Sequence, residues 1–273
     1  MFHEPPEIAY DPGYAPREIR GGDLLLAFSG DNVLLARGAI PTAAMCPPPQ
    51  SRPRYLFSVA GAGVFLAQDA LEGTELLHYL PVRTFRSMGD PVQAFAGITG
   101  CHLWKWYEAN RFCGRCGAAL VDKADERALC CPRCGHVVYP SIAPSVIAAI
   151  TDGERLLLTR AAQGAYRRDA LVAGYVEIGE TLEAALLREV REETGLQVAD
   201  LRYIASQPWG FSGSLLAGFF CRLQGSPAIR LLDGELGQAR WVSRGELPAQ
   251  PHPMSLTRTM MELFRTGQDP YSR

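Results

Sequence analysis

The stretch from Gly174 to Leu196 constrains the fold of this chain more than any other part of the sequence. Thr181 is a residue type suited to cap the start of a helix, and Gly195 suits the left-handed position just after a helix ends. Between them, apolar residues recur at helical spacing, namely Leu182, Ala185, Leu186 and Val190. The pattern predicts an amphipathic helix between Thr181 and Gly195 that is anchored on a hydrophobic core.

The polar side of this helix carries Glu189, Glu192 and Glu193, at positions i, i+3 and i+4. A helix places all three on one face, within reach of a shared cation. A solvated acidic surface is the ordinary interpretation of a Glu-rich helix. Here the apolar stripe fixes the acidic face beside a glycine-bounded entrance at residues 174–179, which favours a site for Mg²⁺ or Mn²⁺. Such ions can bridge a diphosphate and activate a water, so the pattern indicates attack on phosphorus.

A second strong pattern is a pair of CxxC motifs separated by fourteen residues, with the ligand set Cys113, Cys116, Cys131 and Cys134. This is close to zinc-ribbon spacing, and four thiolates suit tetrahedral zinc. Gly117 and Gly135 follow the two motifs and relieve backbone strain in each tight turn. Because four protein ligands leave no position for water, we expect a structural Zn²⁺ here.

Two nearby residues compete for a place in this zinc site. Cys130 would lengthen the second motif to CxxxC, so Cys131 is the favoured ligand, and His136 is interpreted as a surface or packing residue. The scattered Cys46, Cys101 and Cys221 are read as small core or surface thiols. Since the first sixteen residues contain no apolar stretch of signal-peptide length, we expect a reducing, cytoplasmic location.

Composition excludes two classes of function. A net charge of −2 and a pI of about 6.2 argue against a protein that coats nucleic acid. The longer apolar stretches, such as residues 24–28 and 146–150, have the length of strands and fall far below the ~20 residues of a membrane helix.

A length of 273 residues predicts two domains or one domain with an added module.

The order of short patterns along the chain predicts three domains. Residues 21–86 alternate apolar runs with turns, which indicates a small β-rich unit, and residues 92–110 show helical spacing that leads into the cysteines. From residue 140 onward, strand, turn, strand and then helix indicate a mixed α/β domain. The predicted domains are a β-rich domain with a connecting helix at 1–110, a zinc ribbon at 111–139 and a catalytic domain at 140–273.

The stretch 174–196 resembles the Nudix box, because it matches every defined position of G-x5-E-x7-R-E-U-x-E-E-x-G-U, where U is a bulky apolar residue. The resemblance implies an α/β/α sandwich with a mixed sheet that hydrolyses a nucleoside diphosphate linked to another group. It also implies Glu189 and Glu193 as principal metal ligands, help from Glu192, an Arg188 that orients a glutamate by ion pairing, and the Ala173 carbonyl as a further ligand. Either Glu192 or Glu193 then takes the proton from the attacking water.

A second stretch, residues 206–214, is similar to the S-Q-P-W-P-F-P-x-S signature of bacterial NADH diphosphatases of the NudC type, with six of eight defined positions in agreement. Aromatic residues here would stack on a base, and polar residues would bind it. The predicted substrate-binding residues in this stretch are Gln207, Pro208, Trp209, Gly210, Phe211, Ser212, Gly213 and Ser214. Gly210 and Ser212 each replace a proline, which removes backbone constraint and predicts a looser nucleotide pocket.

The same resemblance assigns four more residues and an activity. It implies substrate contacts from Tyr139, Tyr175 and Thr257, and a metal ligand outside the helix at Glu235. It further implies hydrolysis of NADH to reduced nicotinamide mononucleotide and AMP, slower cleavage of NAD⁺, removal of NAD caps from RNA, and a homodimer. Two alternatives stay open: a Nudix hydrolase of another dinucleotide or a nucleotide sugar, and a nucleic-acid-binding zinc-ribbon protein with an inactive Nudix fold.

Overall fold

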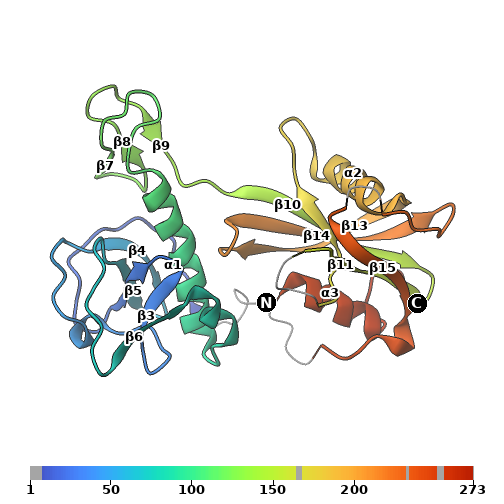
Figure 1. Cartoon of the computed structure of the whole chain (residues 1–273), viewed down its shortest axis with the longest axis horizontal. Coiled ribbons are helices and arrows are strands. Elements are labelled where there is room, and N and C mark those ends of the chain that lie inside the picture. The colour runs from blue at the N-terminus through green and yellow to red at the C-terminus, as the bar shows by residue number, and fades with distance from the viewer. Residues whose placement is uncertain (1–7, 164–167, 232–233, 251–254, 273) are drawn as a thin grey trace. The chain divides into compact units, whose positions relative to one another are not determined.

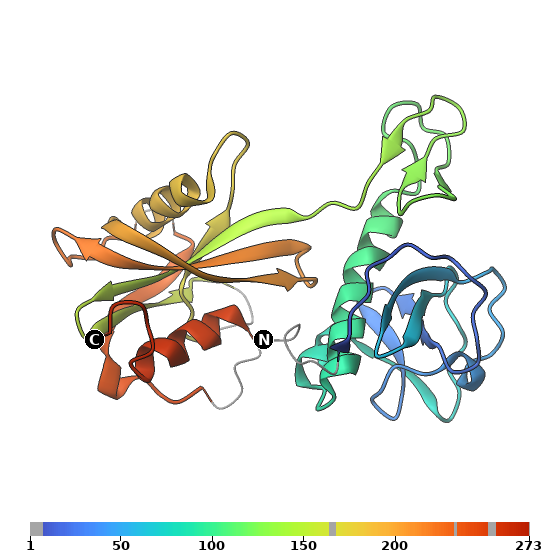
Figure 2. The same cartoon turned by 180° about the vertical axis from the view of Figure 1, so that it is seen from behind.

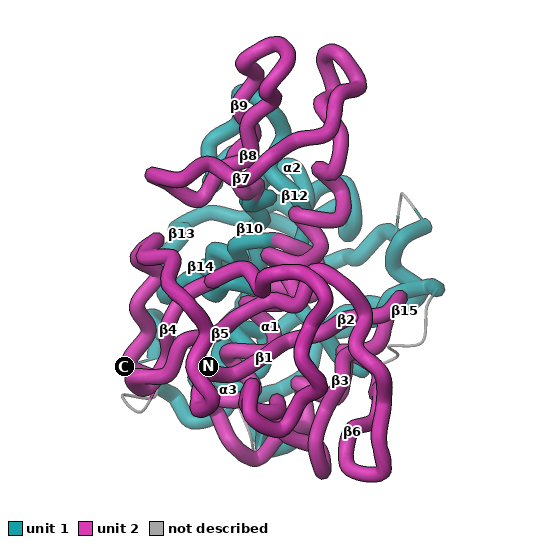
Figure 3. Tube along the Cα trace, turned by 90° about the vertical axis from the view of Figure 1, so that its left-hand side faces the viewer, with its two compact units in different colours: residues 1, 142–209, 214–273 teal, residues 2–141, 210–213 magenta. Residues whose placement is uncertain are grey.

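The computed structural model describes residues 8–163, 168–231, 234–250 and 255–272, and the chain forms two compact units (Figure 3). The C-terminal unit comprises Ile142–Trp209 and Ser214–Arg273. The N-terminal unit comprises Phe2–Ser141 together with Gly210–Gly213. This division does not test the three predicted domains, whose boundaries stay a prediction.

The C-terminal unit is built on a six-stranded sheet with the order β13-β14-β10-β11-β15, in which β12 pairs with β10. Neighbours β10 and β14 run parallel, whereas the other pairs are antiparallel. The predicted mixed sheet is therefore confirmed. The strand bounds are Ala143–Asp152 for β10, Arg155–Ala161 for β11, Val172–Tyr175 for β12, Gln197–Trp209 for β13, Ser214–Gln224 for β14 and Leu236–Ser243 for β15.

Two helices cover opposite faces of this sheet, α2 (Leu182–Thr194) on one face and α3 (Leu256–Arg265) on the other (Figures 1 and 2). Strand β10 explains how both faces are filled, because successive side chains of a strand point to opposite sides. Its residues 146, 148 and 150 join the core with α2, while residues 147 and 149 join the core with α3. The α/β/α sandwich implied by the sequence is confirmed.

Helix α2 begins and ends where the sequence predicts. The Thr181 hydroxyl accepts a hydrogen bond from the Ala184 N–H at 3.1 Å, and Gly195 has φ of 69° in the left-handed region. Leu186 and Val190 are fully buried, and burying such side chains stabilises the fold by roughly 1.5–3 kcal/mol each. The apolar side thus fixes the helix on the sheet and leaves its polar side for chemistry.

The β-rich character of the N-terminal unit is also confirmed. One sheet has the order β1-β5-β4 and a second has the order β2-β3-β6. Helix α1 (Pro91–Ala109) follows, and the Asp90 carboxylate accepts hydrogen bonds from the N–H groups of its first turn. The strand bounds are Leu24–Leu26 for β1, Phe28–Ser29 for β2, Asn32–Ala36 for β3, Arg54–Val59 for β4, Ala62–Leu66 for β5 and Leu77–Pro81 for β6; short 3-10 helices span Ala43–Met45 and Val82–Ser87.

The stretch 24–28, expected as one apolar strand, is divided between these two sheets. The Leu26 carbonyl accepts from the Ala67 N–H at 2.8 Å, and the Ala27 carbonyl accepts from the Leu34 N–H at 2.9 Å. The chain therefore passes from one sheet to the other at Ala27. Apolar content alone does not reveal such a crossover, because both halves are buried.

Three short strands form the zinc ribbon after α1, in the order β7-β8-β9: Val121–Asp122, Leu129–Cys130 and Val137–Val138. In the described part of the chain, no helix combines the length and the apolar character needed to cross a membrane.

Candidate active site and zinc centre

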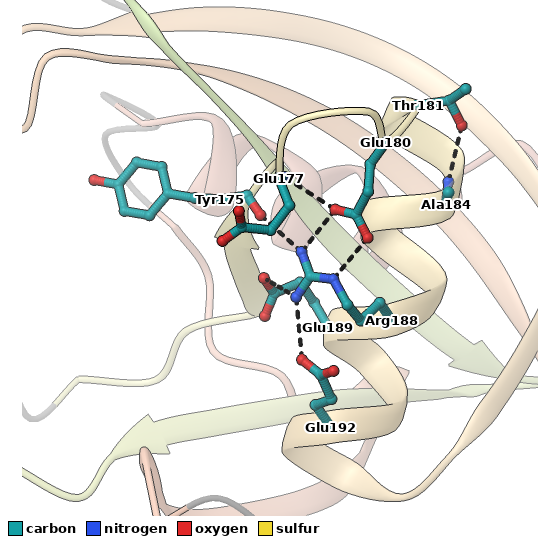
Figure 4. A network of polar contacts seen from close by, with 8 residues as sticks. All are labelled: Tyr175, Glu177, Glu180, Thr181, Ala184, Arg188, Glu189 and Glu192. Carbon is teal, nitrogen blue, oxygen red and sulfur yellow. Dashed lines mark hydrogen bonds and ion pairs between the residues drawn. The ribbon is translucent and has the colours of Figure 1, made fainter.

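Arg188 organises the polar side of α2 (Figure 4). Its Nε and Nη2 atoms donate to the two carboxylate oxygens of Glu180 at 2.7 and 2.9 Å. Its Nη1 atom donates to Glu189 at 2.8 Å and to Glu192 at 3.1 Å, and Nη2 also donates to the Tyr175 carbonyl at 2.9 Å. One planar guanidinium thereby holds three carboxylates and strand β12 in a fixed arrangement.

Glu180 is the residue of this network to which the sequence alone assigns no role. Hydrogen bonds from Arg188 and from the Glu177 N–H lower the pKa of the Glu180 carboxyl to about 2. Glu180 therefore stays ionised and fixes the loop before α2. Its position as a defined glutamate of the box was the signal available in the sequence.

Glu189 lies directly against the backbone of β12. A Cβ atom added to Gly174 would lie 2.0 Å from the Glu189 carboxyl carbon, so the glycine leaves the space that this carboxylate occupies. Burial raises the pKa of Glu189, the Arg188 charge opposes that rise, and the nearby charges of Glu192 and Glu235 add to it. The structure thus brings Glu235, which lies outside the helix, within electrostatic reach of Glu189.

The other two glutamates of the helix differ in exposure. Glu193 is 3% exposed, whereas the Glu192 side chain is 49% exposed. Hard carboxylate oxygens of this kind are the donors that Mg²⁺ and Mn²⁺ prefer, so the residue set fits such an ion. These carboxylate oxygens do not form a donor cluster as close as that of the cysteine sulfurs, and one Arg188 nitrogen, Nη1, binds an oxygen of both Glu189 and Glu192.

The four predicted zinc ligands do converge. The Sγ atoms of Cys113, Cys116, Cys131 and Cys134 all lie within 4.8 Å of one another, and no other such cluster occurs among the described residues. Two pairs are 3.6 and 3.5 Å apart, close to the ~3.8 Å edge of a tetrahedron with 2.3 Å zinc–sulfur bonds. The glycines at 117 and 135 have φ of 73° and 71°, as expected after such turns.

Both competing residues lie outside this sulfur cluster. Cys130 is the last residue of β8 and is not part of the cluster, whereas the predicted ligand Cys131 is. The His136 carbonyl accepts a hydrogen bond from the Cys131 N–H at 2.9 Å, so this residue supports the turn through its backbone.

Several predicted substrate-binding residues meet at the start of α3. Gln207 is fully buried, and its side-chain oxygen accepts from the Leu256 N–H at 2.7 Å. Thr257 is the next residue of the helix, so the structure brings it beside the 206–209 stretch. Pro208 pairs with Leu215 and Trp209 with the buried Ser214 in the β13–β14 ladder. Gln207 thus has a structural role that its sequence position did not reveal.

The remaining predicted contacts divide between the two units. Tyr175 belongs to the C-terminal unit, is 52% exposed and pairs with Ser145 across the β10–β12 ladder. Tyr139 belongs to the N-terminal unit, is 56% exposed and donates its hydroxyl hydrogen to Glu126 at 3.2 Å. Gly210, Phe211, Ser212 and Gly213 also belong to the N-terminal unit. The substrate-binding roles of all these residues stay predictions.

Two family models match the chain. The NUDIX domain model matches residues 142–263, and the NADH pyrophosphatase zinc ribbon domain model matches residues 108–139. A crystal structure of a Nudix hydrolase from Nitrosomonas europaea superposes with a TM-score of 0.50 at 21% identity, covering 58% of this chain and 92% of that one. That likeness shows the fold alone.

Curated relatives share more of the sequence. The chain is 42% identical over 159 residues to the NAD-capped RNA hydrolase NudC of Stutzerimonas stutzeri, covering 58% of this chain and 57% of that one. It is 37% identical over 186 residues to the protein of that name in Pseudomonas aeruginosa, covering 68% of this chain and 66% of that one. For the protein of that name in Chromobacterium violaceum, identity is 35% over 211 residues, which is 76% of this chain and 78% of that one. The matched stretch thus spans less than two thirds of the Stutzerimonas and Pseudomonas relatives.

The sandwich, the glutamate helix with its Arg188 network and the four-cysteine centre define a Nudix domain preceded by a zinc ribbon. With a relative matched at 35% identity over most of both chains, the protein belongs to the NudC family of Nudix hydrolases.

Proposed function

We propose that this chain hydrolyses the diphosphate bond of NADH and of the NAD cap on RNA. NADH would give reduced nicotinamide mononucleotide and AMP, and NAD⁺ would be cleaved more slowly. One water adds to a phosphorus, the bridging phosphorus–oxygen bond breaks, and two monophosphates leave. The observation that carries the proposal is the Arg188 network, in which one guanidinium binds three of the four box glutamates, in a chain of the NudC family.

Two properties of the site support a divalent cation, Mg²⁺ or Mn²⁺, as its cofactor. Glu189 is a carboxylate close to two other carboxylates, and Glu193 is a buried one. When bound there, such a cation neutralises charge on the diphosphate and lowers the pKa of the attacking water. We assign Glu189 and Glu193 as the principal ligands, with Glu235 and the Ala173 carbonyl as further ligands.

The chain's own residues then divide the remaining work. Arg188 orients the carboxylates of Glu189 and Glu192, and Glu180 holds Arg188 in place. The proton of the attacking water goes to Glu192 or to Glu193, and the separate Glu192→Gln and Glu193→Gln variants distinguish these two bases. Tyr175, Trp209 and Phe211 would stack on the bases of the dinucleotide.

Zinc has a different role in this proposal. Four cysteine ligands complete a tetrahedron, so the ion would stabilise the ribbon and take no part in hydrolysis. We further propose a cytoplasmic location, where reduced thiols persist, and a homodimer, as the family resemblance implies.

The direct test is hydrolysis of a panel of substrates with Mg²⁺ or Mn²⁺, with products identified by mass: NADH, NAD⁺, ADP-ribose, a diadenosine polyphosphate, a nucleotide sugar and NAD-capped RNA. Preferred release of AMP and reduced nicotinamide mononucleotide from NADH is the expected result. Cleavage of another diphosphate with no cleavage of NADH or NAD-capped RNA would overturn the substrate assignment and leave the Nudix chemistry. Binding of RNA without cleavage of any diphosphate would favour the inactive nucleic-acid-binding alternative.

A further inference from the structure

Asp169 joins two neighbouring strands of the C-terminal unit, β11 and β15. Its Oδ1 atom accepts hydrogen bonds from Arg160 Nε at 2.7 Å and from Arg240 Nη1 at 2.9 Å, and its Oδ2 atom accepts one from Arg240 Nη2 at 2.9 Å. Arg160 belongs to β11 and Arg240 to β15. The bonds from Arg240 to both carboxylate oxygens have the bidentate geometry that restrains the two groups most strongly. Asp169, Arg160 and Arg240 thus form a clamp across the two strands.

The two arginines of the clamp are neighbours on one face of the sheet. Arg240 pairs with Leu158 in the β11–β15 ladder, so Arg160, two residues further along β11, is its diagonal neighbour. Because side chains alternate along a strand and Leu158 belongs to the core with α3, both arginines lie on the face opposite α2. Two like charges so placed repel each other unless an anion lies between them. The hydrogen bonds from Arg240 chiefly lower the pKa of Asp169, which therefore supplies that anion at neutral pH.

The pairing of β11 with β15 becomes irregular immediately after Arg160. The register shifts there, and Gly237 is the extra residue of β15. A Cβ atom added to Gly237 would lie 2.9 Å from the Ala162 Cα, so the two backbones are in direct contact. The Ala162 N–H also donates to the Glu235 carbonyl at 2.8 Å. Glu235 therefore lies just beyond a β-bulge, a feature that changes the direction of a strand and of the side chains next to it.

The position of Glu235 depends on how the start of β15 is held. Glu235 directly precedes this strand and lies within electrostatic reach of Glu189. Because the bulge interrupts the regular ladder, fewer backbone bonds fix this end of the strand. The Ala162 hydrogen bond restrains it beyond the bulge, and the Asp169 clamp joins β11 to β15 before the bulge. These two contacts together determine where the Glu235 carboxylate lies.

We propose that Asp169 is a positioning residue, which binds Arg160 and Arg240 and thereby holds Glu235 in place as a ligand of Mg²⁺ or Mn²⁺. The inference rests on the proposed function, in which Glu235 is such a ligand. The clamp lies on the sheet face opposite α2, so Asp169 itself does not need to touch the substrate. Its loss should therefore weaken metal binding more than it lowers kcat at saturating metal.

The test measures Mn²⁺ binding to the full, zinc-loaded chain without substrate, from the electron paramagnetic resonance signal of free Mn²⁺. We expect Asp169→Asn and Arg240→Met each to raise the Kd for Mn²⁺ about tenfold, with kcat for NADH at saturating Mn²⁺ changed less than about threefold. Asp169→Glu keeps the charge and should recover part of the lost affinity. The matched control is Asp152→Asn, which removes the partner of Arg155 at the opposite end of β11 and should leave the Kd unchanged.

A double substitution shows whether Asp169 acts through Glu235. Glu235→Gln should itself weaken Mn²⁺ binding, and adding Asp169→Asn should then weaken it little further. Effects that simply multiply in the double variant would overturn the positioning role, as would an unchanged Kd for Asp169→Asn alone. If Glu235→Gln bound Mn²⁺ as tightly as the wild-type chain, the ligand role in the proposed function would fail, and the inference with it.

Hydrogen exchange measured by mass spectrometry gives a readout that needs neither metal nor substrate. Asp169→Asn should speed amide exchange in the peptide 234–243 and leave the peptide 182–194 unchanged. Unchanged exchange in the peptide 234–243 would overturn the clamp. If the wild-type chain bound Mn²⁺ but did not cleave NADH, the proposed substrate would fail, and the Mn²⁺ and exchange data would still decide the role of Asp169.

Discussion

The four-cysteine cluster of the ribbon and the glutamate cluster around helix α2 differ in how their donor atoms are held. In the ribbon, four sulfurs converge within 4.8 Å and leave no position open. In the Nudix unit, Arg188 holds oxygens of Glu189 and Glu192, and Glu235 approaches from a separate segment. Four cysteines can complete the coordination of a structural ion, whereas carboxylates drawn from separate segments leave room for substrate and water.

The largest expected effect comes from replacing the buried carboxyl group of Glu193. Glu193→Gln should lower kcat for NADH by about 10²–10⁴-fold, because both candidate roles of this residue, ligand and base, require a carboxylate. Steady-state kinetics at saturating Mn²⁺ measure it. The matched control is Glu183→Gln, an exposed glutamate in the first turn of the same helix, which should keep full activity. Full activity of the Glu193 variant would remove the proposed mechanism.

A smaller effect is expected from Arg188, which binds the carboxylates of Glu180, Glu189 and Glu192. Arg188→Lys should lower kcat/KM by about ten- to a hundredfold, because one ammonium cannot bind Glu180 through two atoms and also hold Glu189 and Glu192. Arg191→Lys, at an exposed position of the helix, is the control. Equal activities of the two variants would show that the network has no catalytic importance.

The four-cysteine site should show the opposite behaviour, because its loss should reduce stability far more than catalysis. Cys131→Ser should abolish zinc binding and lower the melting temperature of the ribbon, while kcat falls less than about threefold. Metal analysis and calorimetry measure these effects, and Cys130→Ser, beside it in sequence, should keep its zinc. A loss of kcat as large as that of the Glu193 variant would give zinc a catalytic role.

The smallest effect on catalysis is expected at Asp23. Like Glu180, this carboxylate is bound by an arginine, but it lies in the N-terminal unit, away from the Nudix box. Asp23 accepts two hydrogen bonds from Arg17, at 2.6 and 2.7 Å, and these chiefly lower its pKa to about 2. Asp23→Asn should cost roughly 2 kcal/mol of stability and leave kcat unchanged.

The same residue predicts how stability depends on pH. Because the folded pKa lies below the unfolded value of about 4, the contribution of Asp23 is complete above that pH and is lost as the pH falls toward 2. The free energy of unfolding, measured with urea, should therefore change less between pH 6 and pH 3 for Asp23→Asn than for the wild-type chain. An equal change in the two proteins would contradict this role of Asp23.

The sequence predicted the parts of the molecule that depend on local spacing. The helix with its caps at Thr181 and Gly195, the four zinc ligands and the mixed sandwich all follow from patterns along a single stretch. It did not predict that Gln207 is buried against the start of α3, or that the stretch 24–28 is divided between two sheets. These contacts join residues far apart in the chain, and their residue types fit several environments equally well.

One measurement tests the division between the two metal sites most directly. The protein is dialysed against EDTA, its zinc content is determined, and NADH hydrolysis is followed before and after adding Mg²⁺ or Mn²⁺. We expect one zinc per chain to remain, hydrolysis to fall to background, and activity to return with either added ion. Activity that survives dialysis, or that follows the zinc content and does not respond to Mg²⁺ or Mn²⁺, would contradict the assignment of the glutamate site as the centre of catalysis.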